Sequence, residues 1–252
     1  MSNVYTNELD AASGQNILIP SGYNLSLGGT ILNSSSIPPD PTDQEGKYLV
    51  SNNTDAIFRN IGPASIQTFY TSSTWTRPDG INRIIVRVTG GGGGGSGHAE
   101  SGGAAGYAEE VIDVRGISSV YCTIGNGSTS GTYYSGGAAN GGTTSFGNYM
   151  SASGGNGANR NYQHCGGLPG VGSGGNLNIY GGGGSGHEYW SGMPGGGSFF
   201  GGAGSTGHPR GGHYAYNHQY RAAKGSGGSP GYHTSRRGAR GMAGVVCVWN
   251  FR

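Results

Sequence analysis

The sequence predicts a mostly β and irregular protein with almost no α-helix, in which an N-terminal β-rich module precedes a packed bundle of polyglycine II helices with loops at both ends. Glycine is the first reason, because 50 of the 57 glycines lie from Gly90 onward and many stand in runs. Short polar and aromatic segments between these runs are the second reason. The third is that no long stretch repeats apolar residues with the 3.6-residue period of an amphipathic helix.

The glycine runs are compatible with several kinds of structure. A collagen triple helix is excluded, because glycine keeps no strict three-residue period and the chain has only 10 prolines. Disorder stays open, since Leu, Ile, Val and Phe together make up 39 of the 252 residues. The net charge of only +2 and the many aromatic residues argue against disorder. A conventional β-fold with glycine loops also stays open, and the packed bundle is favoured over both.

A polyglycine II bundle has a definite physical requirement. Each helix has three residues per turn, rises about 3.1 Å per residue and forms no internal hydrogen bonds. Neighbouring helices must therefore pair every N–H and C=O group, which requires a close approach that only residues without a Cβ permit. Leucine in place of a glycine within residues 181–184 is accordingly expected to disrupt folding.

Residues 1–89 are expected to form a separate β-rich domain, and residues 90–252 the glycine-rich one. The first domain contains only 7 glycines but 22 of the 39 Leu, Ile, Val and Phe residues. Apolar residues alternate through residues 25–32 on both sides of a Gly-Gly pair, and residues 47–51 and 56–59 are typical of further β-segments.

Hydrophobic burial in the glycine-rich domain is expected to come from a sheet at one end of the bundle. Four segments have the pattern of its strands: residues 84–88, 107–114, 120–124 and 245–251. The first of them leads directly into six consecutive glycines, and the last would return the C-terminus to the same end. This sheet would supply the apolar contacts that the glycine runs lack.

The segments between the glycine runs are of two kinds, as an up-and-down bundle requires. Residues 143–152, 176–180 and 198–200 are apolar and are expected near the sheet. The others are polar and aromatic and are expected at the opposite, exposed end. The two kinds alternate as far as Phe200. Beyond it, the last strand can end beside the sheet only if residues 205–224 cross the length of the bundle one additional time.

Composition and local motifs argue against an enzyme, a metal site and a bound cofactor. The run that ends at His98 lacks the following Lys-Ser/Thr of a phosphate-binding loop. With only 12 acidic residues, few of them in the expected loops, a pair of catalytic carboxylates is hard to assemble. His208, His213 and His218 recur every five positions, but without acidic or Cys partners they favour exposed recognition over metal binding.

Other classes of protein are restricted as well. The N-terminus shows no signal peptide and no apolar run reaches 18 residues, which predicts synthesis in the cytoplasm and no membrane insertion. The three cysteines are too scattered for a disulfide framework or a zinc site, and Cys122 and Cys247 are expected to be small buried hydrophobes. Arg236, Arg237 and Arg240 among glycines are similar to segments that track single-stranded nucleic acid, but the small net charge argues against that partner.

Glycine-rich motifs that alternate with short dissimilar segments, after a glycine-poor N-terminal third, resemble the receptor-recognising adhesin at the distal tip of T-even-type bacteriophage long tail fibres. The stretch WTRPDGINRIIVRVTGGGGGG (residues 75–95) also looks like the entry into glycine-rich regions of other phage tail proteins. The resemblance implies a virion protein whose N-terminal part attaches to the trimeric distal fibre protein. It further implies that loops of a polyglycine II bundle bind a porin-type outer-membrane protein of the host bacterium and so determine host range.

The residues expected to bind the receptor are the aromatic, His and Arg residues of the exposed segments. Tyr, Trp and Arg carry most of the binding energy at protein interfaces, and antibody paratopes display such residues on Gly-, Ser- and Asn-rich loops. The candidates are Tyr133, Tyr134, Tyr162, His164, His187, Tyr189, Trp190, His208, Arg210, His213, Tyr214, Tyr216, His218, Tyr220, Tyr232, His233, Arg236 and Arg237. A tip that binds a glycan such as lipopolysaccharide stays open as an alternative, because Tyr and Trp also stack on sugars.

Overall fold

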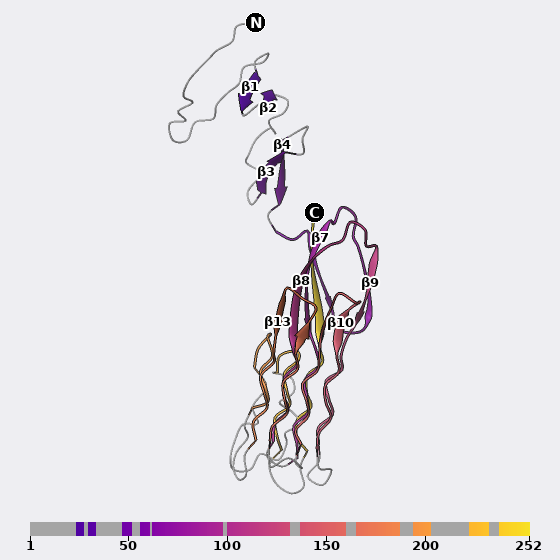
Figure 1. Ribbon diagram of the computed structural model, residues 1–252, viewed down its shortest axis with the longest axis vertical. Coiled ribbons are helices and arrows are strands. Elements are labelled where there is room, and N and C mark those ends of the chain that lie inside the picture. Colours follow the sequence, from indigo (N-terminus) through magenta and orange to yellow (C-terminus); the bar gives the residue numbers. More distant parts are fainter. Residues whose placement is uncertain are drawn as a thin grey trace, which may run out of the picture. The chain divides into compact units, whose positions relative to one another are not determined.

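The structure is a computed structural model that describes residues 24–27, 30–33, 47–51, 56–60, 62–97, 100–131, 137–159, 165–186, 194–202, 222–231 and 237–252. These residues form strands and turns and contain no helix (Figure 1), so the predicted β class is confirmed for them. Accordingly, this part of the chain contains no helix long and apolar enough to cross a membrane. The chain divides into two compact units, Met1–Gly62 and Pro63–Arg252.

The N-terminal unit contains two antiparallel strand pairs. β1 (Asn24–Leu27) pairs with β2 (Thr30–Asn33) on the two sides of the Gly-Gly pair, as the alternating pattern there predicts. β3 (Lys47–Ser51) pairs with β4 (Ala56–Asn60), and both strands lie where the sequence predicts them.

The second unit is built on two five-stranded antiparallel sheets (Figure 1). The first sheet has the strand order β13-β8-β7-β14-β5 and the second β12-β11-β10-β9-β6. The strands are β5 (Ser65–Phe69), β6 (Ser73–Thr76), β7 (Arg83–Thr89), β8 (Tyr107–Asp113), β9 (Ser119–Thr123), β10 (Thr144–Phe146), β11 (Met150–Ala152), β12 (Gly172–Ser173), β13 (Leu177–Ile179) and β14 (Val245–Phe251).

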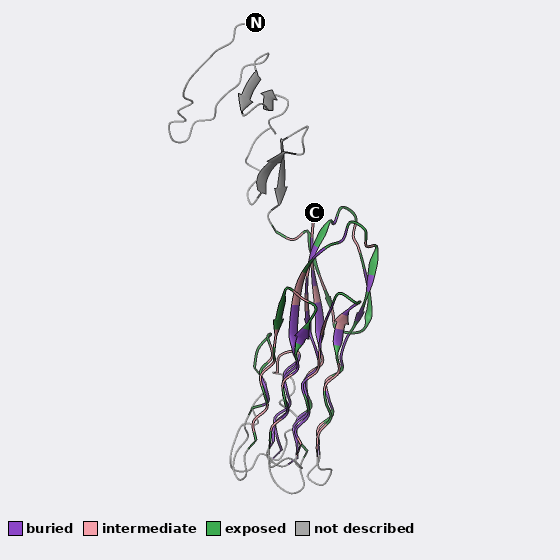
Figure 2. Cartoon of the chain, viewed as in Figure 1, coloured by how far each residue is buried: buried purple, intermediate pink, exposed green. Residues whose placement is uncertain are grey.

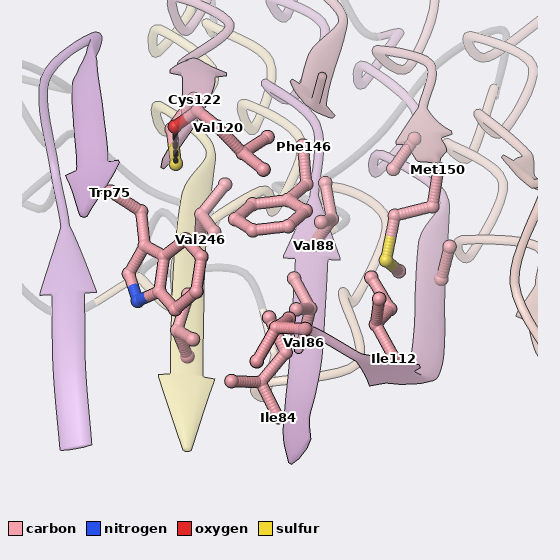
Figure 3. Packing of buried hydrophobic residues seen from close by; sticks show 14 of the residues in the cluster. Trp75, Ile84, Val86, Val88, Ile112, Val120, Cys122, Phe146, Met150 and Val246 are labelled. Atoms are coloured by element: carbon pink, nitrogen blue, oxygen red, sulfur yellow. Dashed lines mark hydrogen bonds between the residues drawn. The ribbon is translucent and has the colours of Figure 1, made fainter. Parts of the chain in front are cut away.

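The hydrophobic core lies between the two sheets (Figure 3). Along β7 the side chains of Ile84, Val86 and Val88 are buried, while the residues between them are less so. Trp75 is fully buried at the other side of the core, with its ring centroid 5.9 Å from that of Phe146. Alternation with one buried face per strand is what two sheets packed face to face require.

One expectation about the sheets is wrong. The four strands predicted to form one sheet are divided, because β7, β8 and β14 lie in the first sheet and β9 in the second, where it pairs with β6 and β10. The reason is that β7 and β9 both have an apolar face. A single sheet would leave these faces without cover, whereas two packed sheets bury each against the other.

On one side of the sheets, the glycine-rich segments run back and forth outside any strand (Figure 1). We call each length a pass, the end next to the sheets the basal end, and the opposite end the distal end. The ten described passes are residues 90–96, 100–106, 125–131, 137–143, 153–159, 165–171, 181–186, 194–197, 225–231 and 237–244. Residues 143–152 and 176–180 connect basal ends through strands, and residues 198–201 through a turn, so the predicted place of the apolar connectors is confirmed.

Pass 90–96 is completely buried at the centre of this arrangement (Figure 2). Its N–H groups donate in turn to three antiparallel passes, and the pattern repeats every three residues. The bonds run from Gly91 and Gly94 to Gly142 and Ala139, from Gly92 and Gly95 to Met242 and Ala239, and from Gly93 and Ser96 to Gly103 and Glu100.

The carbonyl groups of the same pass accept from three further passes, which run parallel to it. The donors are Gly155 and Ala158 of one pass, Ser128 and Gly131 of another, and Gly228 and Gly231 of the third. Pass 90–96 therefore has six hydrogen-bonded neighbours. Pass 100–106 likewise bonds to six passes, so two adjacent central passes are surrounded by the remaining eight described ones.

Glycine is required at the centre because backbone atoms approach from every side. A Cβ on Gly91 would lie 2.1 Å from the carbonyl oxygen of Asn126, one on Gly92 1.9 Å from that of Ser226, and one on Gly93 2.0 Å from that of Asn156. Real Cβ atoms essentially never come this close to another heavy atom. The three directions belong to three different passes.

The expectation that every glycine within residues 181–184 resists substitution is wrong at one position. A Cβ on Gly181 or Gly184 would meet backbone oxygen at 2.4 Å or 2.1 Å. A Cβ on Gly183 would meet only Pro169 Cδ at 4.0 Å, because this position faces outward on a peripheral pass.

These positions give a matched pair of substitutions. Gly92→Ala is expected to lower the free energy of unfolding by about 3 kcal/mol, because two passes must move apart to admit the methyl group. Gly183→Ala is expected to be neutral or to stabilise by up to about 1 kcal/mol, since alanine reduces the entropy of the unfolded chain. Urea unfolding of both variants and the wild type measures the difference, and equal stabilities would contradict the packing described here.

Candidate functional site

The distal end is the part of the second unit where described passes stop and resume. Five interruptions lie there, between Gly97 and Glu100 and between the ends of four further pairs of passes. In each of these four pairs, one pass ends and the next begins at the following residues: Gly131 and Gly137, Asn159 and Cys165, Gly186 and Pro194, and Gly231 and Arg237.

Backbone hydrogen bonds hold these pass ends at a common level. The N–H groups of Gly131 and Gly231 donate to the carbonyl oxygens of Gly95 and Ser96, over 3.0 and 2.8 Å. Pass 181–186 is tied in by Ser101, whose N–H donates to the carbonyl of Ser185 over 2.9 Å. The segments that interrupt the passes are therefore anchored on a framework that central passes 90–96 and 100–106 organise.

The candidate receptor-binding residues fall mostly beyond what the structure describes. Arg237 is described, and it is exposed at the distal end. All the other candidates lie outside the described residues. For those within 132–136, 160–164, 187–193 and 232–236, the described residues on both sides belong to the distal end.

The segment 203–221 is anchored differently. Its described neighbours are Gly202 and Ala222, and the N–H of Ala223 donates to the carbonyl of Gly202 over 3.3 Å. The hydroxyl of Ser198 also donates to the carbonyl of Lys224 over 2.6 Å, next to the basal turn. The additional pass predicted for residues 205–224 falls on this segment, and so lies outside the described residues.

Sequence reasoning missed a buried acidic group at the distal end. Glu100 has no exposed surface, although it directly follows residues 98–99, which lie outside the described residues. Its N–H donates to Ser96 Oγ over 3.1 Å, and the hydroxyl of Ser96 donates to its carboxylate. The signal that could have found it is a lone acid, four residues after a serine, at the junction of two glycine runs.

A second polar cluster supports the basal end. The Arg87 guanidinium lies 2.7 Å from the carboxylate of Glu109, its direct cross-strand partner, and 4.7 Å from the ring centroid of Trp249. The hydroxyl of Tyr107 donates to the same carboxylate, and Phe199 stacks on the Tyr107 ring at 3.6 Å. Burial, together with the bond to Glu109, raises the pKa of Tyr107 above its usual value. The cluster fixes the turn at residues 198–201 to β8.

Metal chemistry finds no support among the residues that the structure describes, since they include no group of three His, Cys, Asp or Glu side chains able to hold an ion. Comparison of the chain with protein-family models found no match, and no curated protein is similar to it at a significant level. Function therefore has to be argued from the arrangement of the passes.

The cysteines offer a test of the described geometry. Cys165 is exposed at the distal end, whereas Cys122 is fully buried in the core and burial raises its pKa to about 11. Because only the thiolate reacts, about one Cys122 in a thousand would be reactive at pH 8, even without the steric protection. Iodoacetamide at pH 8 is expected to modify Cys165 at least 100-fold faster than Cys122, by peptide mass mapping with a urea-unfolded control. Equal rates in the folded protein would contradict the burial of Cys122.

Proposed function

We propose that this protein is a phage tail-fibre tip adhesin, which binds the host surface through the segments that interrupt its passes at the distal end. The observation that carries the proposal is the convergence of five interruptions on one end of a hydrogen-bonded set of ten described passes. Such an arrangement separates a hydrogen-bonded scaffold from the short segments that it displays. The role is one of binding, without catalysis and without a cofactor.

The scaffold that we propose is a bundle of polyglycine II helices. The three-residue repeat of hydrogen bonds from pass 90–96 to its neighbours is the pattern expected for helices with three residues per turn. Every N–H group of the two central passes, and every C=O group except those of Gly90 and Ala105, bonds to a group outside its own helix, as this conformation requires. A bundle paired in all lateral directions resists bending, and so suits a post that carries a binding surface.

The composition of the interrupting segments supports recognition of a protein. They hold ten of the eighteen candidate Tyr, Trp, His and Arg residues, and such residue types provide the anchors of protein interfaces. One interrupting segment consists of the five residues between Gly131 and Gly137. Five residues span at most about 17 Å even when fully extended. Short segments anchored at both ends lose little entropy on binding, which favours affinity.

The partners follow from the same proposal. The distal segments bind a porin-type outer-membrane protein, and the N-terminal unit attaches the chain to the trimeric distal fibre protein at the tip of the virion's long tail fibre. Isolated two-stranded pairs such as β1–β2 and β3–β4 are marginally stable at best in water. Their need for a further surface supports a role in attachment.

Pull-down from detergent-solubilised outer membranes of a panel of Gram-negative bacteria tests the function. We expect the full chain to retain one porin-type protein from a susceptible strain and none from a deletion strain that lacks it. Binding that persists without the porin but disappears on loss of the lipopolysaccharide sugars would assign the tip to glycans instead. Absence of binding across strains that the phage infects would contradict the adhesin role.

A bulky label can locate the binding end. Polyethylene glycol attached through maleimide to Cys165 is expected to weaken binding to susceptible cells at least about tenfold, because it occupies the distal end. The matched control carries the same polymer on Asp79→Cys in a Cys165→Ser background, at an exposed turn of the sheets. This control is expected to bind within about twofold of the unlabelled chain. Cell-binding assays by flow cytometry measure both, and equal effects would refute a distal site.

A further inference from the structure

We propose that Ser96 and Glu100 form a clamp at the distal end that positions the receptor-binding segments, an inference that rests on the function proposed above. Three hydrogen bonds between the described atoms of these two residues make up the clamp. Ser96 N–H donates to Glu100 O over 2.9 Å, Glu100 N–H donates to Ser96 Oγ over 3.1 Å, and Ser96 Oγ donates to the Glu100 carboxylate. It joins the ends of the two central passes across the shortest of the five interruptions, residues 98–99.

The clamp is joined directly to the neighbouring pass ends. The carbonyl of Ser96 itself accepts from Gly231, and that of the adjacent Gly95 accepts from Gly131. On the other side, Ser101 follows Glu100 and accepts from Gly167 over 2.9 Å. Gly131 and Gly231 each stand directly before an interruption, and Gly167 is the third residue after another. Three of the four outer interruptions are therefore held next to residues 95–101 by a backbone hydrogen bond.

Ser101 extends the same network to the remaining interruption. Its hydroxyl accepts from the N–H of Ser185 over 2.6 Å, while its own N–H donates to the carbonyl of that residue. Ser185 is the second-last residue of its pass before residues 187–193. Hydrogen bonds to residues 95–101 therefore fix the position of a pass end beside each of the four outer interruptions.

Glu100 is an unusual residue for this place. It is the only acid in the ten described passes and has no exposed surface. Acidic side chains are rarely buried completely, since removal from water costs several kcal/mol unless hydrogen bonds and charges compensate. The retained carboxylate therefore indicates a bond that the turn needs.

The clamp makes Glu100 a positioning residue that acts through the backbone of its neighbours. Three variants separate its parts. Glu100→Ala removes the acceptor, Glu100→Gln keeps an acceptor oxygen of the same shape, and Ser96→Ala removes the hydroxyl with little change of volume. Asp79→Asn, in an exposed turn of the sheets, is the control for loss of one negative charge.

Amide hydrogen exchange of the full chain, followed by NMR, reads the clamp without any receptor. Glu100→Ala and Ser96→Ala are expected to raise the exchange rates of the Gly131 and Gly231 amides about tenfold. The Gly91 and Gly142 amides, at the basal end, are the internal control and are expected to stay unchanged. Unchanged exchange at Gly131 and Gly231 in Ser96→Ala would overturn the clamp, even if Glu100→Ala failed to fold.

Binding to outer-membrane vesicles of a susceptible strain links the clamp to function. Glu100→Ala is expected to bind at least about tenfold more weakly than the wild type, and Glu100→Gln and Asp79→Asn within about threefold. Equal loss in Glu100→Gln and Glu100→Ala would overturn the positioning role, since the charge alone would then be responsible. Full binding by folded Glu100→Ala would overturn it as well. If the wild type itself bound no vesicles, the adhesin function would fail while the exchange experiment still decided the clamp.

Discussion

Hydrogen bonding between bare backbones in several lateral directions is the constraint on which the rest of this structure depends. A strand in a sheet has partners on two sides, whereas each central pass here has six hydrogen-bonded neighbours. Side chains cannot be accommodated where these backbones lie closest together, because a Cβ on Gly92 would lie 1.9 Å from a carbonyl oxygen. Glycine is costly to order, but the pairing of every central N–H group and of nearly every central C=O group offsets that cost across the whole set.

The two sheets supply what the passes lack. They bury Trp75, Phe146 and the valines of β7 and β14, and this apolar burial drives folding. Two threonines couple the layers to the passes. Thr89 Oγ1 donates to the carbonyl of Gly106 over 2.9 Å, and Thr144 Oγ1 accepts from the N–H of Gly125 over 2.9 Å. Strand register in the sheets therefore determines the register of the passes, since each pass continues directly from a strand or a basal turn.

If the proposed function holds, stability and recognition belong to different residues. Backbone atoms of the passes hold the distal end at one level, so the interrupting segments need contribute little to folding. A clamp of Ser96 and Glu100 at the centre of that end connects the two roles, because it is part of the scaffold and contacts the bases of the display segments. Recognition segments on such a support could change composition with little effect on the passes.

The sequence by itself determined the β class, the position of most strands and the alternation of basal and distal connectors, because apolar alternation and glycine runs are local patterns. It also indicated Cys122 as buried, which its strand pattern predicts, but the same expectation is wrong for Cys247, which is only half-buried in β14. The division of the strands between two sheets was decided only by tertiary structure, since covering two apolar faces depends on partners far apart in the chain. The same holds for the openness of Gly183 and the burial of Glu100. Whether a position faces a neighbour or solvent is decided by which passes lie beside it, and no local pattern contains that information.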